Sequence, residues 1–123
     1  MFNLPAGEIT GELIDSQELD GLMEQLPLTS SGNVWGKEIY FEITRPIGTG
    51  QKTKEAEVGD VAYWEEGRSV CIFFGPTPVS KSERPEPYVP VFKIGRVSLE
   101  GMAMALLEGF EQGQPVTLAA GKS

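Results

Sequence analysis

The segment from Val58 to Pro78 constrains the fold of this chain more than any other stretch of the sequence. Two apolar runs rich in aromatic residues, 61–64 and 69–74, flank an acidic turn, and the second run ends at a Gly-Pro-Thr-Pro sequence. Short runs of β-branched and aromatic residues on either side of a glycine-containing turn are typical of a β-hairpin, and Gly-Pro is a strong stop signal. We therefore predict a hairpin at the centre of an all-β core.

The periodic placement of apolar residues predicts the elements around this hairpin. Alternation of apolar and polar residues indicates strands, and the expected strands are residues 8–14, 35–43, 91–97 and 115–119. Apolar stripes with helical spacing indicate helices, and the expected helices are residues 15–26 and 99–110. Asp15 and Glu18 have the spacing of a capping box for the first helix, and Ser98 suits the cap of the second.

The remaining stretches are predicted loops, at residues 28–34, 46–57 and 75–90. The last holds five prolines, which cannot donate to a sheet ladder, so we expect an extended surface segment there. The 123 residues show no internal repeat or domain boundary, and one domain of this size buries a core without disulfides. A closed antiparallel β-barrel with helices at its ends would bury both helix stripes and leave no exposed sheet edge.

Charge narrows the partners that the chain is expected to have. The formal net charge is −8, and the first 30 residues hold six carboxylates and no lysine or arginine. Such a surface repels phosphate backbones and anionic lipid head groups, so we expect no nucleic-acid or membrane partner. No apolar run approaches the ~20 residues of a membrane span, and the first residues lack the basic and apolar regions of a signal peptide. The cytoplasm is therefore the expected location.

The chain has no histidine and a single cysteine, Cys71. The lack of histidine removes the commonest general base and the commonest metal ligand, and one cysteine cannot form an intrachain disulfide. Cys71 lies between Val70 and Ile72, with no base to activate it, so we expect a buried structural thiol rather than a nucleophile. No cofactor or metal is expected.

The stretch Val91-Phe-Lys-Ile-Gly-Arg-Val-Ser-Leu-Glu-Gly-Met102 resembles the cyclophilin segment in which a strand reading Val-Phe-Gly-Lys-Val enters a Gly-Met helix. The pair Phe73-Phe74 is similar to the cyclophilin Gln-Phe-Phe strand. The chain also resembles a family of small microbial cyclophilin-like proteins of unsettled function. Three segments carry this resemblance: Trp35-Gly-Lys-Glu-Ile-Tyr-Phe41, Gly59-Asp-Val-Ala-Tyr-Trp64 and Cys71-Ile-Phe-Phe-Gly-Pro-Thr-Pro78. This resemblance implies one cyclophilin-like domain over residues 1–123, a closed antiparallel β-barrel capped by two α-helices.

The residues of cyclophilin prolyl isomerases do not carry over to this chain. Those enzymes have a Phe-His-Arg strand whose arginine polarises the prolyl nitrogen, whereas the comparable strand here reads Lys37-Glu-Ile-Tyr-Phe41. The Phe-Met-x-Gln-Gly-Gly motif is absent, and Cys71-Ile72 stands where the family has the glutamine before its Phe-Phe pair. The histidine that opens the next strand in the family falls near Val91. The resemblance therefore implies the fold without the isomerase residues.

In cyclophilins the outer face of this sheet binds an extended proline peptide in an apolar pocket, and aromatic walls suit such a ligand. The candidate groove residues in this chain are Glu38, Tyr40, Tyr63, Trp64, Phe73, Phe74 and Arg96. For the aromatic residues the alternative is burial in the barrel core, which we favour for Phe73 and Phe74. Arg96 would replace the missing isomerase arginine only if it pointed into the groove.

We interpret the chain as a cyclophilin-like binding protein with an aromatic groove for an extended peptide or a small apolar ligand. The alternative is a peptidyl-prolyl cis-trans isomerase with a non-standard active site, because desolvating and twisting the prolyl amide lowers its barrier of ~18–20 kcal/mol without covalent chemistry. A third hypothesis is a homodimer formed through exposed aromatic side chains. Arg68, in the predicted hairpin turn, is expected to pair with Glu65 or Glu66 at the surface.

Overall fold

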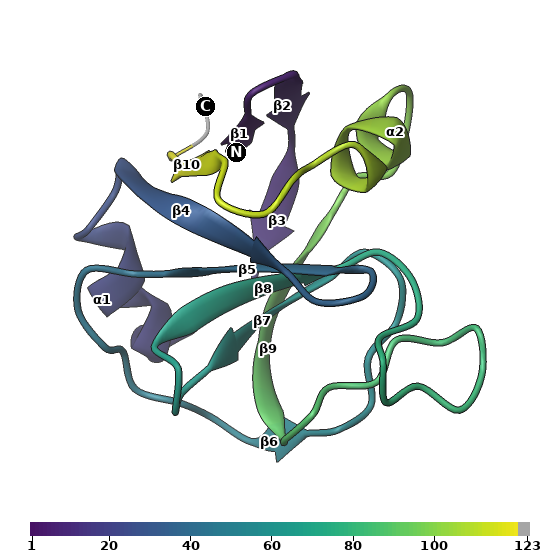
Figure 1. Cartoon of the computed structure of the whole chain (residues 1–123). Coiled ribbons are helices and arrows are strands. Elements are labelled where there is room, and N and C mark those ends of the chain that lie inside the picture. Colours follow the sequence, from purple (N-terminus) through teal and green to yellow (C-terminus); the bar gives the residue numbers. More distant parts are fainter. Residues whose placement is uncertain (121–123) are drawn as a thin grey trace.

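A computed structural model describes residues 1–120 and contains one antiparallel sheet that curls into a nearly closed barrel (Figure 1). Its strands are β1 (Phe2–Leu4), β2 (Gly7–Ile9), β3 (Gly11–Leu13), β4 (Leu28–Val34), β5 (Glu38–Glu42), β6 (Lys52–Thr53), β7 (Asp60–Trp64), β8 (Ser69–Phe73), β9 (Val91–Val97) and β10 (Pro115–Leu118). The helices are a 3-10 turn (Gln17–Leu19) that runs into α1 (Asp20–Met23), and α2 (Ala103–Glu108). The predicted mainly β architecture and the β7–β8 hairpin are thus confirmed.

The barrel closes through a single short segment of chain. Neighbouring strands follow the order β2-β1-β10-β4-β5-β8-β7-β9-β3, with β6 paired to β9 at the side. The two ends of this order, β2 and β3, are consecutive in the sequence and are separated only by Thr10. The amide of Ser98 donates to the Thr10 carbonyl at 2.8 Å, which ties this junction to the end of β9. The arrangement leaves little free sheet edge, as expected for a barrel.

Gly95 lets β3 and β9 approach closely where the barrel closes. A Cβ atom at this position would overlap with the carbonyl oxygen of Glu12 and would lie 3.0 Å from the Cα atom of Leu13. Backbone atoms cannot move aside as a flexible side chain does, so Gly95→Ala is expected to lower the free energy of unfolding by about 1–3 kcal/mol. Urea denaturation followed by circular dichroism measures this loss. Gly48→Ala is the matched control, because its Cβ would meet only Glu18 at an ordinary 3.5 Å.

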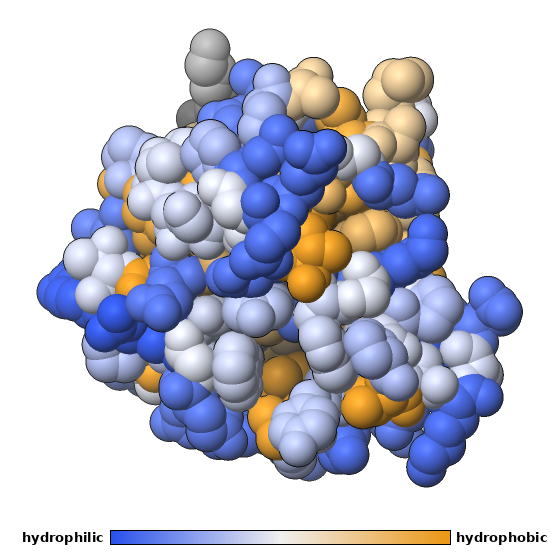
Figure 2. All heavy atoms as spheres, viewed as in Figure 1, coloured by the Kyte–Doolittle hydropathy of each residue, from blue (hydrophilic) through white to orange (hydrophobic). Residues whose placement is uncertain are grey.

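The barrel interior is filled from both the sheet and the helices. Inward-facing residues of the central strands, such as Ile39, Phe41 and Ile94, are fully buried. The helical segments add Leu22 and Leu107 to the same core cluster, which explains the apolar stripes seen in the sequence. On the face shown in Figure 2 hydrophilic residues predominate, and apolar residues gather over α2.

The structure corrects two loop predictions: the short strand β6 lies within residues 46–57, and residues 28–34 form strand β4. This strand pairs with β10 on one side, Val116 opposite Ser30, and with β5 on the other, Gly32 opposite Phe41. The sequence did not indicate this strand because its side chains are mostly polar. The Thr29 hydroxyl lies 2.7 Å from the Thr117 hydroxyl on the neighbouring strand β10. The proline-rich segment, by contrast, contains no strand across residues 75–90, as predicted.

Both helices are shorter than the apolar stripes predicted. The first spans residues 17–23 instead of 15–26, and Ser16 rather than Asp15 precedes it, with its hydroxyl bonded to the Glu18 carboxylate. The second begins at Ala103 because Gly101 has a φ of +63°, which a right-handed helix excludes. Within residues 1–120, the structure has no helix with the length and apolar character needed to cross a membrane.

Candidate ligand-binding pocket

The sheet carries a second apolar surface on its outer face, opposite the barrel core. Because side chains alternate along a strand, Ile39 and Phe41 enter the core while Glu38 and Tyr40 face outward. The outer cluster that packs beside them comprises Ala56, Ala62, Cys71, Phe73 and Val91. The hairpin strand β8 is buried at all five positions, which means that it is covered on both sides.

This outer face holds a pocket of about 380 Å³, here called the aromatic pocket. It is lined by Trp35, Glu38, Tyr40, Trp64, Cys71, Phe73, Pro87, Tyr88, Val89 and Val91. Strands β5, β7, β8 and β9 supply its floor, and the proline-rich segment supplies one wall. Its volume lies within the range of about 300–1,000 Å³ that small-molecule sites occupy.

A tight turn before β5 positions Trp35 at the pocket. The amide of Trp35 donates to the Glu38 carbonyl at 2.9 Å, and the Glu38 amide donates back at 3.1 Å. Gly36 makes the turn with a φ of +59°, and a Cβ there would lie 2.7 Å from the ring of Pro78. The turn is thus locked between β5 and the Gly-Pro-Thr-Pro sequence.

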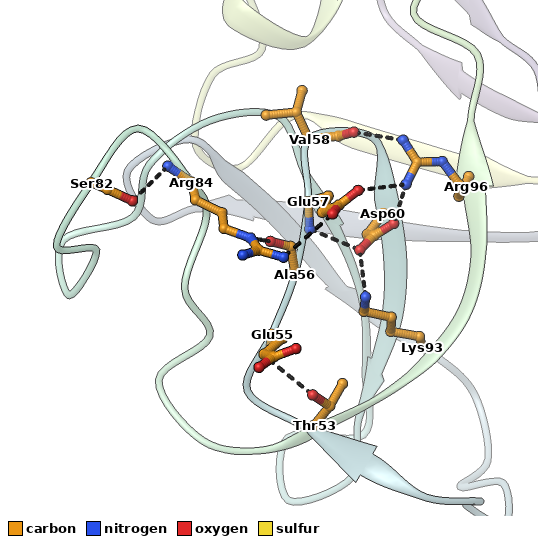
Figure 3. Close-up of polar contacts among 10 residues, drawn as sticks. All are labelled: Thr53, Glu55, Ala56, Glu57, Val58, Asp60, Ser82, Arg84, Lys93 and Arg96. Atoms are coloured by element: carbon orange, nitrogen blue, oxygen red, sulfur yellow. Dashed lines mark hydrogen bonds and ion pairs between the residues drawn. The ribbon is translucent and has the colours of Figure 1, made fainter.

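Internal hydrogen bonds hold the proline-rich wall in place. The Thr77 hydroxyl donates to the Glu86 carbonyl at 2.6 Å, and the Thr77 amide donates to the Ser80 hydroxyl at 2.9 Å. Arg84 reaches across to the Ala56 carbonyl at 3.2 Å (Figure 3). These contacts fix the ends of the segment before its three pocket residues, 87–89, meet the sheet. The path of the wall is therefore set by contacts within the chain itself.

The aromatic rings stand at nearly right angles to one another. Tyr40 and Trp64 lie 5.7 Å apart between ring centroids at 86°, and Trp35 and Tyr88 lie 6.2 Å apart at 88°. The Nε1 atom of Trp64 is buried and has no hydrogen-bond partner among the described residues. Tyr88 is 70% exposed, so its ring stands on the solvent side of the pocket.

Glu38 is the ionisable acid of the pocket, and its side chain is nearly covered, with 6% of the residue exposed. Burial raises the pKa of the Glu38 carboxyl from 4.5 to about 7, against a smaller lowering by a hydrogen bond with Cys71. Burial, together with the charge of Glu38, raises the pKa of the Cys71 thiol well above its ordinary value. Within residues 1–120, Glu38 makes no ion pair.

The structure separates the residues that the sequence grouped as groove candidates. Glu38, Tyr40, Trp64 and Phe73 line the aromatic pocket. Tyr63 and Phe74 lie in the barrel core instead. Tyr63 precedes the outward-facing Trp64 in β7, and Phe74 directly follows the outward-facing Phe73 at the end of β8. The hydroxyl of Tyr63 accepts a hydrogen bond from the Ile47 amide at 3.3 Å.

Arg96 lies outside the aromatic pocket, in a polar cluster shown in Figure 3. Its guanidinium donates to the Asp60 carboxylate at 2.6 Å and to the Val58 carbonyl at 2.8 Å. Lys93 contacts the other oxygen of Asp60 at 3.1 Å. Arg96 therefore has local partners for its charge and does not point into the aromatic pocket.

The hairpin arginine also has a partner other than the one predicted. Arg68 contacts the Glu42 carboxylate at 3.0 Å rather than Glu65 or Glu66. The reason is the register of the sheet, which sets Glu42 opposite Ser69, the residue after Arg68. Glu65 instead pairs with Lys52.

Two pocket aromatics, Trp35 and Tyr88, were not singled out from the sequence. Trp35 was hidden because residues 35–43 were expected to be one strand, whereas Gly36 breaks it into a turn. Tyr88 belongs to the proline-rich segment, and only the folded path of that segment brings it to the sheet. The position of an aromatic residue between two prolines is the local signal that would have raised it.

Among the described residues 1–120, no group of three or more acidic, cysteine or histidine side chains is arranged to hold a metal ion.

Comparison with known proteins then identifies the fold. The structure is similar to the solution structure of the hypothetical protein AF2241 from Archaeoglobus fulgidus, with a TM-score of 0.77 and 31% identity over 96% of this chain and 90% of that one. It also matches the structure of McbB in complex with tryptophan, with a TM-score of 0.70 and 21% identity, over 99% of this chain and 45% of McbB.

No curated protein matches the sequence. A family model described as Cyclophilin-like matches residues 1–119, nearly the whole chain. This match agrees with the barrel, the two helices and the sequence resemblance of the hairpin segments, and the chain belongs to the cyclophilin-like family.

Proposed function

We propose that the protein is a binding protein whose aromatic pocket holds a small apolar ligand or an apolar side chain of an extended peptide. The pocket itself supports this proposal, because it combines apolar walls with one acidic group. Ligand sites are mostly apolar concavities in which a few polar groups set orientation. The wall fixed by Thr77 adds to the argument, since a preformed site loses less entropy on binding.

The chemistry of the lining residues favours binding over covalent catalysis. The thiol of Cys71 is the nucleophilic group of the pocket, and its raised pKa keeps it in the unreactive protonated form at neutral pH. Nucleophilic catalysis needs a base poised to take the proton of an accessible nucleophile, and Cys71 is 1% exposed. We therefore assign no covalent step to this pocket.

A small flat ligand is favoured over a long peptide by the size of the site. The structural neighbour McbB was solved with tryptophan, and at 21% identity that likeness extends to the fold alone. That complex motivates a bicyclic aromatic molecule as the first probe of the pocket. A pocket of about 380 Å³ lined by five aromatic side chains is suited to a ligand of that size.

Titration with indole, followed by NMR, tests the proposed function. We expect the largest amide shifts in β5, β8 and residues 87–89, which border the pocket. Tyr88→Ala is expected to weaken indole binding about 2- to 10-fold, the equivalent of ~0.5–1.5 kcal/mol for one aromatic contact. The control is Met102→Ala, which removes a side chain that is 71% exposed and lies outside the pocket. Shifts confined to other surfaces would contradict the proposal.

Prolyl isomerisation is the alternative activity, and it has less support. The guanidinium of Arg96 is held by Asp60 and Val58, so the pocket has no cation to polarise a prolyl nitrogen. Measuring cis/trans exchange of proline tetrapeptides with and without the protein separates the two functions. An acceleration that disappears in Tyr40→Ala would establish isomerase activity.

Size-exclusion mass measurement tests the predicted homodimer in the same samples.

A further inference from the structure

We propose that the aromatic pocket selects organic cations, specifically a primary amine attached to a flat aromatic ring system, with the Glu38 carboxylate as the counter-ion. This proposal rests on the proposed function, because it names the class of ligand for the same pocket. It stands on three features: a buried acid without an ion pair within residues 1–120, a lining without basic residues, and aromatic rings that line the same pocket.

The first feature is the isolation of Glu38. Buried carboxylates in proteins are normally paired with a cation, because transfer of an unpaired charge out of water is costly. Glu38 is 6% exposed, yet it has no ion pair within the described part of the chain. A ligand ammonium group would supply the missing partner. A ligand carboxylate would instead meet a like charge.

The charged and titratable groups around Glu38 reinforce this selectivity. On β5, Tyr40 shares its face, while the neighbouring Lys37 directs its Nζ atom to Glu108 at 3.4 Å. Cys71 from β8 lines the pocket beside the carboxyl, and Tyr88 comes from the proline-rich segment. None of the ten pocket residues is lysine or arginine. The pocket therefore offers one negative group and no positive one.

The third feature is the arrangement of the rings. A cation is attracted to the face of an aromatic ring within about 6 Å, most strongly to tryptophan. The pairs Tyr40–Trp64 and Trp35–Tyr88 each meet at nearly a right angle, which presents ring faces from different directions. Such walls suit an ammonium group at Glu38 and leave apolar surface for the ring system of the ligand.

Three indole derivatives of nearly equal size test the proposal by isothermal titration calorimetry at pH 8. Tryptamine carries an ammonium group, tryptophol a hydroxyl, and indole-3-acetate a carboxylate. We expect tryptamine to bind at least about tenfold more tightly than tryptophol, a gain of ~1.4 kcal/mol for one buried charge pair. Indole-3-acetate is expected to bind most weakly. Equal affinities for tryptamine and tryptophol would overturn the cation proposal and leave the proposed function standing.

The pH dependence provides an independent readout. Because burial raises the pKa of Glu38 to about 7, the acid is mainly ionised at pH 8 and mainly protonated at pH 6. Tryptamine affinity is therefore expected to fall about tenfold from pH 8 to pH 6, while tryptophol affinity does not fall. A tryptamine affinity that is constant over this range would overturn the role of Glu38.

Glu38→Gln is expected to abolish both the preference for tryptamine and its pH dependence. The matched control is Glu42→Gln, which removes the same charge from the same strand at a site outside the pocket. Glu42→Gln is expected to keep the tenfold preference. An equal loss in the two variants would show that net charge, rather than the pocket, attracts the amine, and would overturn the proposal. If neither indole nor any derivative binds, the proposed function fails as well.

Discussion

Glu38→Gln is expected to unfold at a higher urea concentration than the parent protein at pH 8. The Glu38 carboxyl has a pKa of about 7 in the folded state, whereas the ordinary pKa of such a group, 4.5, applies once the chain unfolds. The folded state therefore binds more protons between these values, so stability from this group is present below pH 4.5 and is lost as pH rises through 7. Ionising the buried acid costs roughly 3 kcal/mol at pH 8, since each pKa unit equals about 1.36 kcal/mol.

Urea denaturation at pH 5 and at pH 8 measures this effect. From pH 5 to pH 8 the free energy of unfolding of the parent is expected to decrease more than that of Glu38→Gln, because the amide of the variant does not titrate. Glu42→Gln is the control, because that side chain is 62% exposed and no large change is expected. A parent and Glu38→Gln that follow the same pH profile would contradict the assignment. A more stable Glu38→Gln also shows that its loss of amine binding is not caused by unfolding.

The second large effect is expected in the barrel core, from Phe41→Ala. Phe41 is fully buried on the inner side of β5, and its ring meets that of Phe2 edge-on, with centroids 6.3 Å apart. Truncation removes the buried ring and leaves a cavity, which typically costs about 3–5 kcal/mol. The loss is measured as a lower denaturation midpoint at unchanged slope.

Tyr88→Ala is the informative comparison for this core variant. Tyr88 is also aromatic, but it is 70% exposed and belongs to a segment without ladder hydrogen bonds. Its truncation is expected to change the free energy of unfolding by no more than about 0.5 kcal/mol, as for surface substitutions in general. If Phe41→Ala were as mild, the inner face of β5 would not be the core that we describe.

Much of the barrel is encoded in local pattern, which explains why it was predictable. The alternation in β5 identifies both the strand and its buried face. The two apolar runs of the β7–β8 hairpin identify the strands but not which side of each faces the barrel, and Phe73, expected in the core, lies in the outer cluster. Strand β4 was missed because its side chains are mostly polar and show no apolar alternation. The second helix was predicted to start too early because its apolar stripe begins at Leu99, whereas the positive φ of Gly101 excludes a right-handed helix before Ala103.

The candidate pocket was only partly visible in the sequence. Alternation alone places Glu38 and Tyr40 on the outer face of β5, but it says nothing about what covers that face. The cover comes from residues 87–89, whose path depends on tertiary hydrogen bonds such as that of Thr77. The unusual state of Glu38 is likewise a product of burial, which no local pattern records.

The double coverage of β8 divides the pocket into parts with unequal freedom to vary. Cys71 and Phe73 sit on a strand whose other side fills the barrel, so a change in the floor disturbs the packing of the whole domain. Trp35, Tyr88 and Val89 come from turns and loops outside the ladder. Relatives with different ligand preferences should therefore diverge first at this rim, and engineering that begins there can alter what is bound at little cost to folding.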